Sequence, residues 1–254
     1  MRRWLVLCGV LGASAPAWAQ DLVVDGTTTT LSGVHTYDRV LIVNGGVLKV
    51  APYDGSAGSG ALDLVANEVL IDPTSRIDGT GAGYTGVSSS AGNGPGGGAT
   101  AGAAGGGGGH GGAGSDGGFP NCATAAGAGG ASNGSLDGVA ELGSAGGAPG
   151  ASGVSGGAGG GAVRIDAATV DIRGRIEVDG LEGLVAGNDE GAGGGAGGEI
   201  VLIANRLYCP GVLSARGGPG GAGRAGQGGG GAGGRVEQWS DEIGEPCTVR
   251  VEGA

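Results

Sequence analysis

Apolar and polar residues alternate along four segments of the chain, and each of these segments begins directly after a glycine. A period of two is the pattern of a β-strand with one buried face. The sequence therefore predicts three short strands per segment, joined by tight turns. The middle turn carries Pro73, Gly174 or Pro210-Gly211. The four segments are residues 61–79, 162–180, 199–217 and 235–251.

The second and third segments align without a gap and begin at Ala162 and Glu199. A unit of short strands cannot bury its apolar face alone, so successive units are expected to stack on a shared core. This favours an all-β fold, a small parallel β-solenoid of about four to five coils, with residues 22–50 at its N-terminal end. A β-sandwich of hairpins with disordered glycine-rich loops is the alternative. The matched apolar pairs are Val163 with Ile200, Ile165 with Leu202, Ala167 with Ala204, Val170 with Leu207, Ile172 with Cys209, and Ile176 with Leu213.

Glycine makes up 69 of the 254 residues and recurs at every third position in several tracts. A period of three is that of an extended left-handed helix with three residues per turn. The 9 prolines are too few for collagen. One register runs through 96–117 with Ala99 as its substitution, and another through 217–232. A third holds Gly147, Gly150, Gly153, Gly156 and Gly159.

These tracts are predicted to be extended, without α-helix, and to pack side by side through their shared glycine register. On that arrangement Gly153 faces a neighbouring segment and tolerates no Cβ, whereas Ser152 faces solvent. Disorder of the tracts is the alternative, because glycine is entropically costly to order. The domain organisation expected is a leader at 1–19, N-terminal coils at 20–80, a glycine-rich insertion at 81–160 and C-terminal coils at 161–254.

The first nineteen residues have the features of a secretory signal peptide. Arg2 and Arg3 precede the apolar run 4–11, and Ala17-Trp18-Ala19 is a small-x-small cleavage site before Gln20. The mature chain is therefore expected to be secreted, at the cell surface or in the periplasm. No second apolar stretch reaches the ~20 residues of a membrane span.

The acidic charge of the chain limits the classes of partner that it can bind. The formal net charge is −11, and Lys49 is the only lysine. Nucleic acid is not expected as a partner, since phosphate binding needs a basic patch. An unknown surface or extracellular polymer is the expected partner, and self-association stays open.

Three cysteines follow the leader, so an oxidising compartment allows one disulfide and leaves one thiol. Cys209 and Cys247 fall in the second half of successive units, where stacking brings them close. The sequence therefore predicts this pair, with Cys122 left over.

Candidate chemistry is sparse. His35 and His110 have no cysteine or second histidine at metal-ligand spacing, so structural or solvated roles are expected for both. Acidic residues near corresponding turns are expected to form a solvated face, with weak cation binding as the alternative. No catalytic, cofactor-binding or metal-binding residue is assigned, and the chain is not expected to be an enzyme. The acidic residues are Asp72, Asp78, Asp171, Glu177 and Asp179.

The Pro-Gly-x-Leu-x-Ala-x-Gly-Gly motif at 210–218 and the Gly-Gly-Ala-Gly runs resemble the glycine-rich repeats of exported bacterial surface proteins. The tracts are also similar to the polyglycine-II sandwich of phage tail-fibre adhesins and to PGRS-type composition. The resemblance covers most of residues 60–251 and brings no catalytic motif. It implies an exported, non-catalytic structural or adhesive protein. An extracellular carbohydrate- or cell-wall-binding module is the alternative, and a polysaccharide-degrading β-solenoid enzyme comes third.

Overall fold

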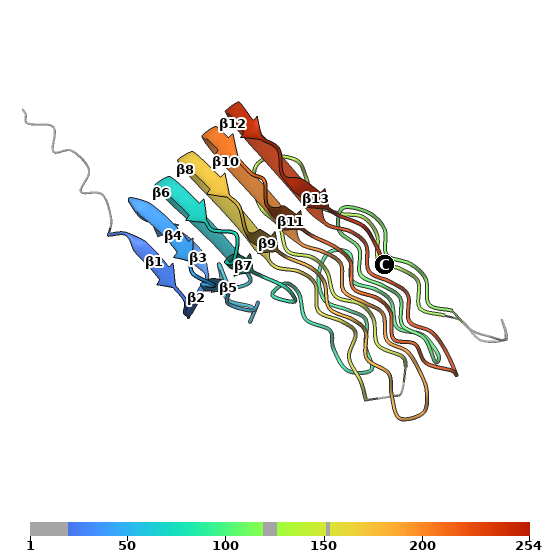
Figure 1. Ribbon diagram of the computed structural model, residues 1–254. Helices are drawn as coiled ribbons and strands as arrows, with labels where there is room; N and C mark the ends of the chain where they lie inside the picture. Colours follow the sequence, from blue (N-terminus) through green and yellow to red (C-terminus); the bar gives the residue numbers. More distant parts are fainter. Residues whose placement is uncertain (1–19, 119–125, 151–152) are drawn as a thin grey trace, which may run out of the picture.

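The computed structural model describes residues 20–118, 126–150 and 153–254. The predicted leader, the leftover Cys122 and Ser152 lie outside these residues. The described chain is all-β and contains no helix. Figure 1 shows the strands side by side at one end of an elongated molecule, with the glycine-rich segments running on from them at the other.

The strands form two sheets, and every pairing between named strands is parallel. The larger sheet has the order β1-β4-β6-β8-β10-β12, with β3 pairing β6 beside β4. The smaller has the order β13-β11-β9-β7-β5-β2. Hairpins pair antiparallel strands, so the alternative of a hairpin sandwich is wrong.

The strands of the larger sheet are β1 (Leu22–Asp25), β3 (Gly33–Thr36), β4 (Arg39–Val43), β6 (Ala61–Ile71), β8 (Ala162–Ile172), β10 (Glu199–Tyr208) and β12 (Arg235–Glu245). Those of the smaller sheet are β2 (Thr28–Leu31), β5 (Val47–Val50), β7 (Arg76–Asp78), β9 (Arg175–Glu177), β11 (Val212–Ser214) and β13 (Thr248–Arg250).

The pairing register reproduces the alignment of the repeated segments. Ile165 pairs with Leu202 across β8 and β10, and Ile176 pairs with Leu213 across β9 and β11. All four side chains are fully buried. Apolar side chains of the two sheets thus form one continuous core from β1 to β11. At the β12–β13 end, Ile243 continues a core row and stays 56% exposed.

Each repeated segment contains two strands, so the expectation of three is wrong. The first two predicted strands form one strand of 10 or 11 residues. Asn67, Ala168 and Asn205 have no paired residue on the neighbouring strand, although pairing continues on both sides of each. These single unpaired residues stand where the first turn was predicted. The second turn lies where Pro73, Gly174 and Pro210-Gly211 predicted it.

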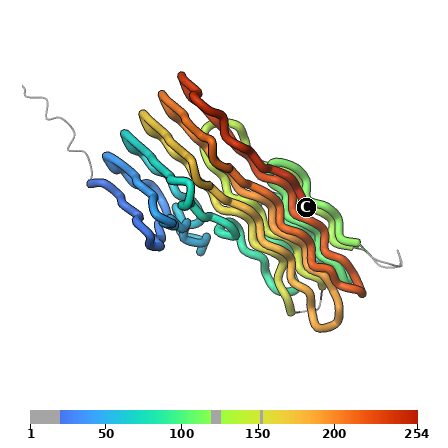
Figure 2. Tube along the Cα trace, in the orientation of Figure 1, coloured from blue at the N-terminus to red at the C-terminus, as the bar shows by residue number. Residues whose placement is uncertain are grey.

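The glycine-rich segments pack into a bundle that carries on from the sheets (Figure 2). Segment 105–109 is buried within it, and its hydrogen bonds repeat every three residues. The N–H groups of Gly105 and Gly108 donate to the carbonyls of Gly191 and Gly194 at 3.0 and 2.9 Å. Those of Gly106 and Gly109 donate to Ala99 and Gly96 at 2.9 and 2.8 Å. One neighbour therefore runs parallel to the segment and the other antiparallel.

The carbonyls of the same segment are also satisfied by neighbours three residues apart. Gly229 donates to Gly105 at 2.9 Å and Ala232 donates to Gly108 at 2.8 Å. Burial of this much backbone requires such pairing, because an unpaired buried N–H or C=O is costly. The tracts are extended, as predicted, and the alternative of disordered loops does not describe this segment.

The glycine register is correct at the ends of 147–159 and wrong in its middle. A Cβ on Gly159 would overlap the carbonyl oxygen of Gly143, and one on Gly156 would overlap that of Gly146. Gly153 is exposed, and a Cβ there would have no atom within 4 Å. Its φ of +71° lies in the left-handed region that favours glycine, and the predicted crowding at Gly153 is wrong.

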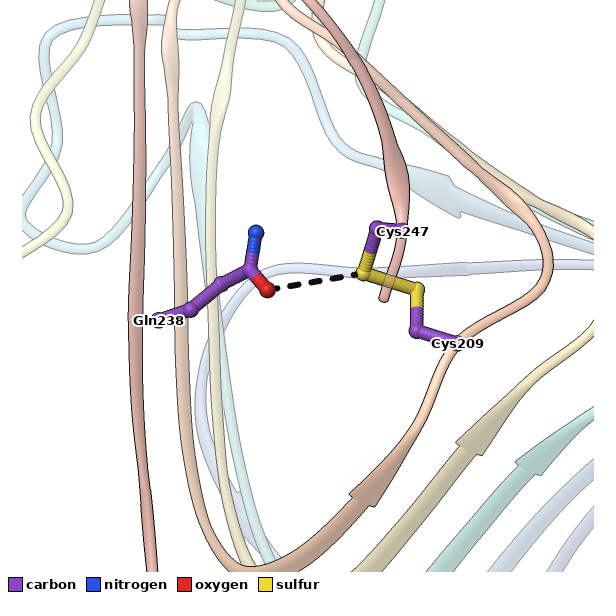
Figure 3. The surroundings of a disulfide bond; sticks show 3 residues. All are labelled: Cys209, Gln238 and Cys247. Carbon is purple, nitrogen blue, oxygen red and sulfur yellow. Dashed lines mark hydrogen bonds between the residues drawn. A yellow bond between two sulfur atoms is a disulfide. The ribbon is translucent and has the colours of Figure 1, made fainter. Parts of the chain in front are cut away.

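The structure joins Cys209 and Cys247 in a disulfide, with their Cα atoms 4.6 Å apart (Figure 3). Cys209 follows β10 and is fully buried, while Cys247 lies between β12 and β13. Their sequence separation is 38 residues. The bond therefore ties the last repeated segment, whose strands end both sheets, to the segment before it.

The bundle predicts unequal effects of one added methyl group. Gly159→Ala is expected to destabilise the chain by about 1–3 kcal/mol, because the methyl meets fixed backbone. Gly187→Ala is the matched control, since Gly187 is exposed and has no atom within 4 Å of a Cβ. Urea unfolding midpoints measure both, and an equal shift for the two variants would contradict a packed bundle.

The disulfide predicts a reductant-sensitive stability. Reduction, or the Cys209→Ala/Cys247→Ala double variant, is expected to lower the unfolding free energy by about 2–4 kcal/mol, through the loop released in the unfolded chain. Peptide mass spectrometry of the oxidised protein checks the pairing. A bridge from Cys122 to either cysteine would contradict it.

Candidate functional site

Polar side chains gather where the glycine bundle meets the larger sheet. Segment 133–142 lies over the starts of the long strands and is held there by carboxylates. The N–H of Glu141 donates to Glu199 Oε2 at 3.0 Å. The N–H of Gly138 donates to Glu237 Oε2 at 3.1 Å. Glu199 and Glu237 are both buried, and they belong to the adjacent strands β10 and β12.

Arg164 holds the same segment from β8. Its Nε donates to the carbonyl of Gly138 at 3.2 Å. Its other nitrogens pair with Asp63 at 2.9 Å and Asp166 at 2.6 Å. Hydrogen bonds that involve charged groups are the stronger ones, so β8, β10 and β12 together fix the position of segment 133–142.

His110 lies beneath this segment, and the expectation of a solvated role is wrong. The side chain is fully buried. Its Nδ1 lies 3.2 Å from the carbonyl oxygen of Leu142, and its Nε2 lies 3.8 Å from Glu199 Oε2. The surrounding glycine backbone buries the ring here. The sequence prediction considered only whether apolar side chains would cover His110, and so it missed this burial. The expected structural role remains.

His35 is half-buried on β3, away from this cluster. Its Nε2 lies 2.9 Å from the carbonyl oxygen of Ser32, and its ring stacks on Tyr37 with centroids 6.1 Å apart. The two histidines therefore belong to different sites, and neither lies beside a second histidine.

Several buried polar atoms at the junction have no hydrogen-bond partner among the described residues. They are His110 Nε2, Glu199 Oε1, Glu237 Oε1 and Arg235 Nη1. The closest cation to Glu141 is Arg235, with Nη1 4.0 Å from Oε2. The His110–Glu199 pair has the residue types of a general acid–base dyad. Both side chains are fully buried, so a solvent-borne substrate does not reach them in this conformation.

The five acidic residues that were expected to form a solvated face take part in hydrogen bonds or ion pairs within the chain. Asp72 illustrates this: burial raises its pKa, but hydrogen bonds from the N–H groups of Asn44 and Thr74 and from neighbouring hydroxyls outweigh burial and bring it to about 2. The other four pair with arginines. These pairs are Asp78 with Arg76, Asp171 with Arg173, Glu177 with Arg175, and Asp179 with Arg216.

Within the described residues, no group of three or more His, Cys, Asp or Glu side chains is arranged to hold a metal ion. In that same part of the chain there is no helix with the length and apolar character needed to cross a membrane. A cavity of about 430 Å³ lies between β3, β6 and segment 133–142. Its lining includes Val34, Leu62, Val139 and Arg164.

Sequence reasoning found His110 but missed its partners. A signal was available at Glu199, which opens β10 at the position that Ala61 and Ala162 occupy in the neighbouring strands. A carboxylate in place of alanine at a buried position requires a polar partner. The sequence has no marker for segment 133–142 as the source of that partner.

No protein-family model, curated protein or solved structure matches this chain.

From the contacts at the junction we expect that removing the His110 side chain lowers the free energy of unfolding more than removing that of His35. His110→Ala is expected to cost about 2–5 kcal/mol, because it empties a fully buried site and leaves the carbonyl of Leu142 without its ring partner. His35→Ala, the matched control, is expected to cost under about 1 kcal/mol. Urea unfolding measures the free energy of unfolding of both variants. Equal costs for the two histidines would contradict the assignment.

Proposed function

We propose that this chain is an exported, non-catalytic structural protein of the cell surface or extracellular space, with an adhesive role. In this proposal the repeated segments form a small parallel β-solenoid, one strand pair per turn. The glycine-rich segments form a polyglycine-II-like layer that extends the solenoid from one corner.

The observation that supports this proposal is the burial of segment 105–109 among other glycine backbones. Its N–H groups bond to several neighbouring segments within the described residues. A bundle of this kind carries few side chains that could position a reacting group. What it provides is a dense hydrogen-bonded layer, whose backbone a protease cannot extract without breaking many bonds at once. That property suits a durable extracellular scaffold.

Two further features support export. The apolar run and the small-x-small site at the N-terminus have the features of a leader. The Cys209–Cys247 disulfide suits an oxidising compartment. The buried His110–Glu199 pair supports a structural role for the most enzyme-like residues of the chain.

The proposal is tested by producing the full chain with its leader in a bacterium. The product is expected outside the cytoplasm, beginning at Gln20 by N-terminal sequencing. It is also expected to resist subtilisin through the glycine-rich segments, with Gly159→Ala cleaved faster and Gly187→Ala cleaved at the wild-type rate. Retention in the cytoplasm would contradict export. Cleavage of the native bundle as fast as in urea would contradict the structural layer.

A further inference from the structure

Beyond segment 133–142, the outer face of the larger sheet carries the exposed side chain of Trp239. Paired positions on three adjacent strands there carry Asp166, Ile203 and Trp239. A groove of about 330 Å³ lies over this row. Asn205, Ser240 and Asp241 complete its polar lining. This volume is at the lower end of the range for small-ligand sites.

Trp239 lies on β12 at one side of the groove and is 55% exposed. Its Nε1 donates to Glu237 Oε2 at 3.1 Å. Glu237 is in turn held by the N–H of Gly138. The polar edge of the indole is therefore satisfied and its position fixed, while much of the ring surface stays accessible. A fixed aromatic surface binds with little loss of side-chain entropy.

The polar groups of the groove differ in how they are engaged. Asp166 is paired with Arg164 at 2.6 Å, so its charge is balanced. Within the described part of the chain, the exposed side chains of Asn205 and Asp241 make no hydrogen bond or ion pair. They lie on adjacent strands, each one residue past the paired Ala204 and Ser240. An amide and a carboxylate together offer both donors and acceptors.

We propose that this groove binds an uncharged glycan chain, with a sugar ring against Trp239 and its hydroxyls hydrogen-bonded to Asn205 and Asp241. A sugar ring has an apolar C–H face and a polar rim, which matches an aromatic surface flanked by hydrogen-bonding side chains. A net charge of −11 and the free Asp241 carboxylate disfavour polyanionic glycans. This inference rests on the adhesive part of the proposed function and names its ligand class.

Tryptophan fluorescence tests the site directly. Trp4 and Trp18 lie in the proposed leader, so Trp239 is the only tryptophan of the processed chain. Titration with a β-1,4-linked glucose hexasaccharide or an N-acetylglucosamine hexasaccharide is expected to give a saturable change. A galacturonic acid hexasaccharide, which is a polyanion, is expected to give none. A change with the polyanion alone would overturn the proposal.

Calorimetry with the same neutral hexasaccharide then compares variants. Trp239→Ala is expected to weaken binding roughly ten-fold or more. Asn205→Ala and Asp241→Ala are each expected to weaken it roughly three- to ten-fold. Ile243→Ala is the matched control, because Ile243 is also exposed on β12 but does not line the groove. It is expected to bind as the wild type does.

The outcomes separate this inference from the proposed function. No binding of either neutral hexasaccharide overturns the groove and leaves the structural layer intact. Concentration-dependent dimerisation that Trp239→Ala abolishes, measured by sedimentation, would assign the groove to a second copy and overturn the glycan. Release of shorter sugars from the hexasaccharide would support the groove and contradict the non-catalytic role.

Discussion

The fold depends on glycine backbones approaching one another where a side chain would not fit. In an ordinary core, apolar side chains fill the space between elements and hydrogen bonds remain inside each sheet. In the bundle the backbone is itself the packing surface, and each residue bonds to neighbours on different sides. Segment 105–109 shows the consequence, because its bonding partners recur every three residues along several different segments. The extended three-residue repeat and the hydrogen-bond network are thus one constraint.

The sheets and the bundle bury different parts of the chain and keep different periods, and both have to meet at their junction. The sheets bury Ile165, Leu202 and their equivalents and keep a two-residue period. The bundle buries backbone and keeps a three-residue period. At the boundary, Glu199 and Glu237 accept hydrogen bonds from N–H groups of segment 133–142, which follows neither the two-residue nor the three-residue period. Buried carboxylates suit this junction because they can accept hydrogen bonds from backbone N–H groups that have no partner in a regular repeat.

The same junction shapes the proposed ligand surface. Segment 133–142 is bonded to one outward row of the larger sheet, at Arg164 and Glu237. In the next row Trp239 stays 55% exposed. Glu237 serves both sides, since it accepts from Gly138 of the covering segment and from the Trp239 indole. The buried Glu237 carboxylate therefore links the exposed Trp239 ring to segment 133–142 and restricts the movement of the ring.

Local patterns determined much of this protein. The period-two alternation located the repeated strand-forming segments and their parallel register, because Val163 and Ile200 can share a core only when their segments stack side by side. The position of Cys209 and Cys247 in equivalent halves of successive segments predicted their proximity for the same reason. The glycine period predicted extended segments. These features follow from the spacing of residue types along the chain, which can be read from the sequence alone.

Tertiary structure decided what spacing could not express. The first two predicted strands became one, because pairing continues on both sides of Asn67 and Asn205. Gly153 proved to be exposed, with no atom near a Cβ, although it lies in register with the crowded Gly159. His110 became buried through segments distant in sequence, and its neighbour Glu199 lies 89 positions further along the chain. Which face of an extended glycine segment is crowded depends on the segments that surround it, and that is a property of the assembled bundle.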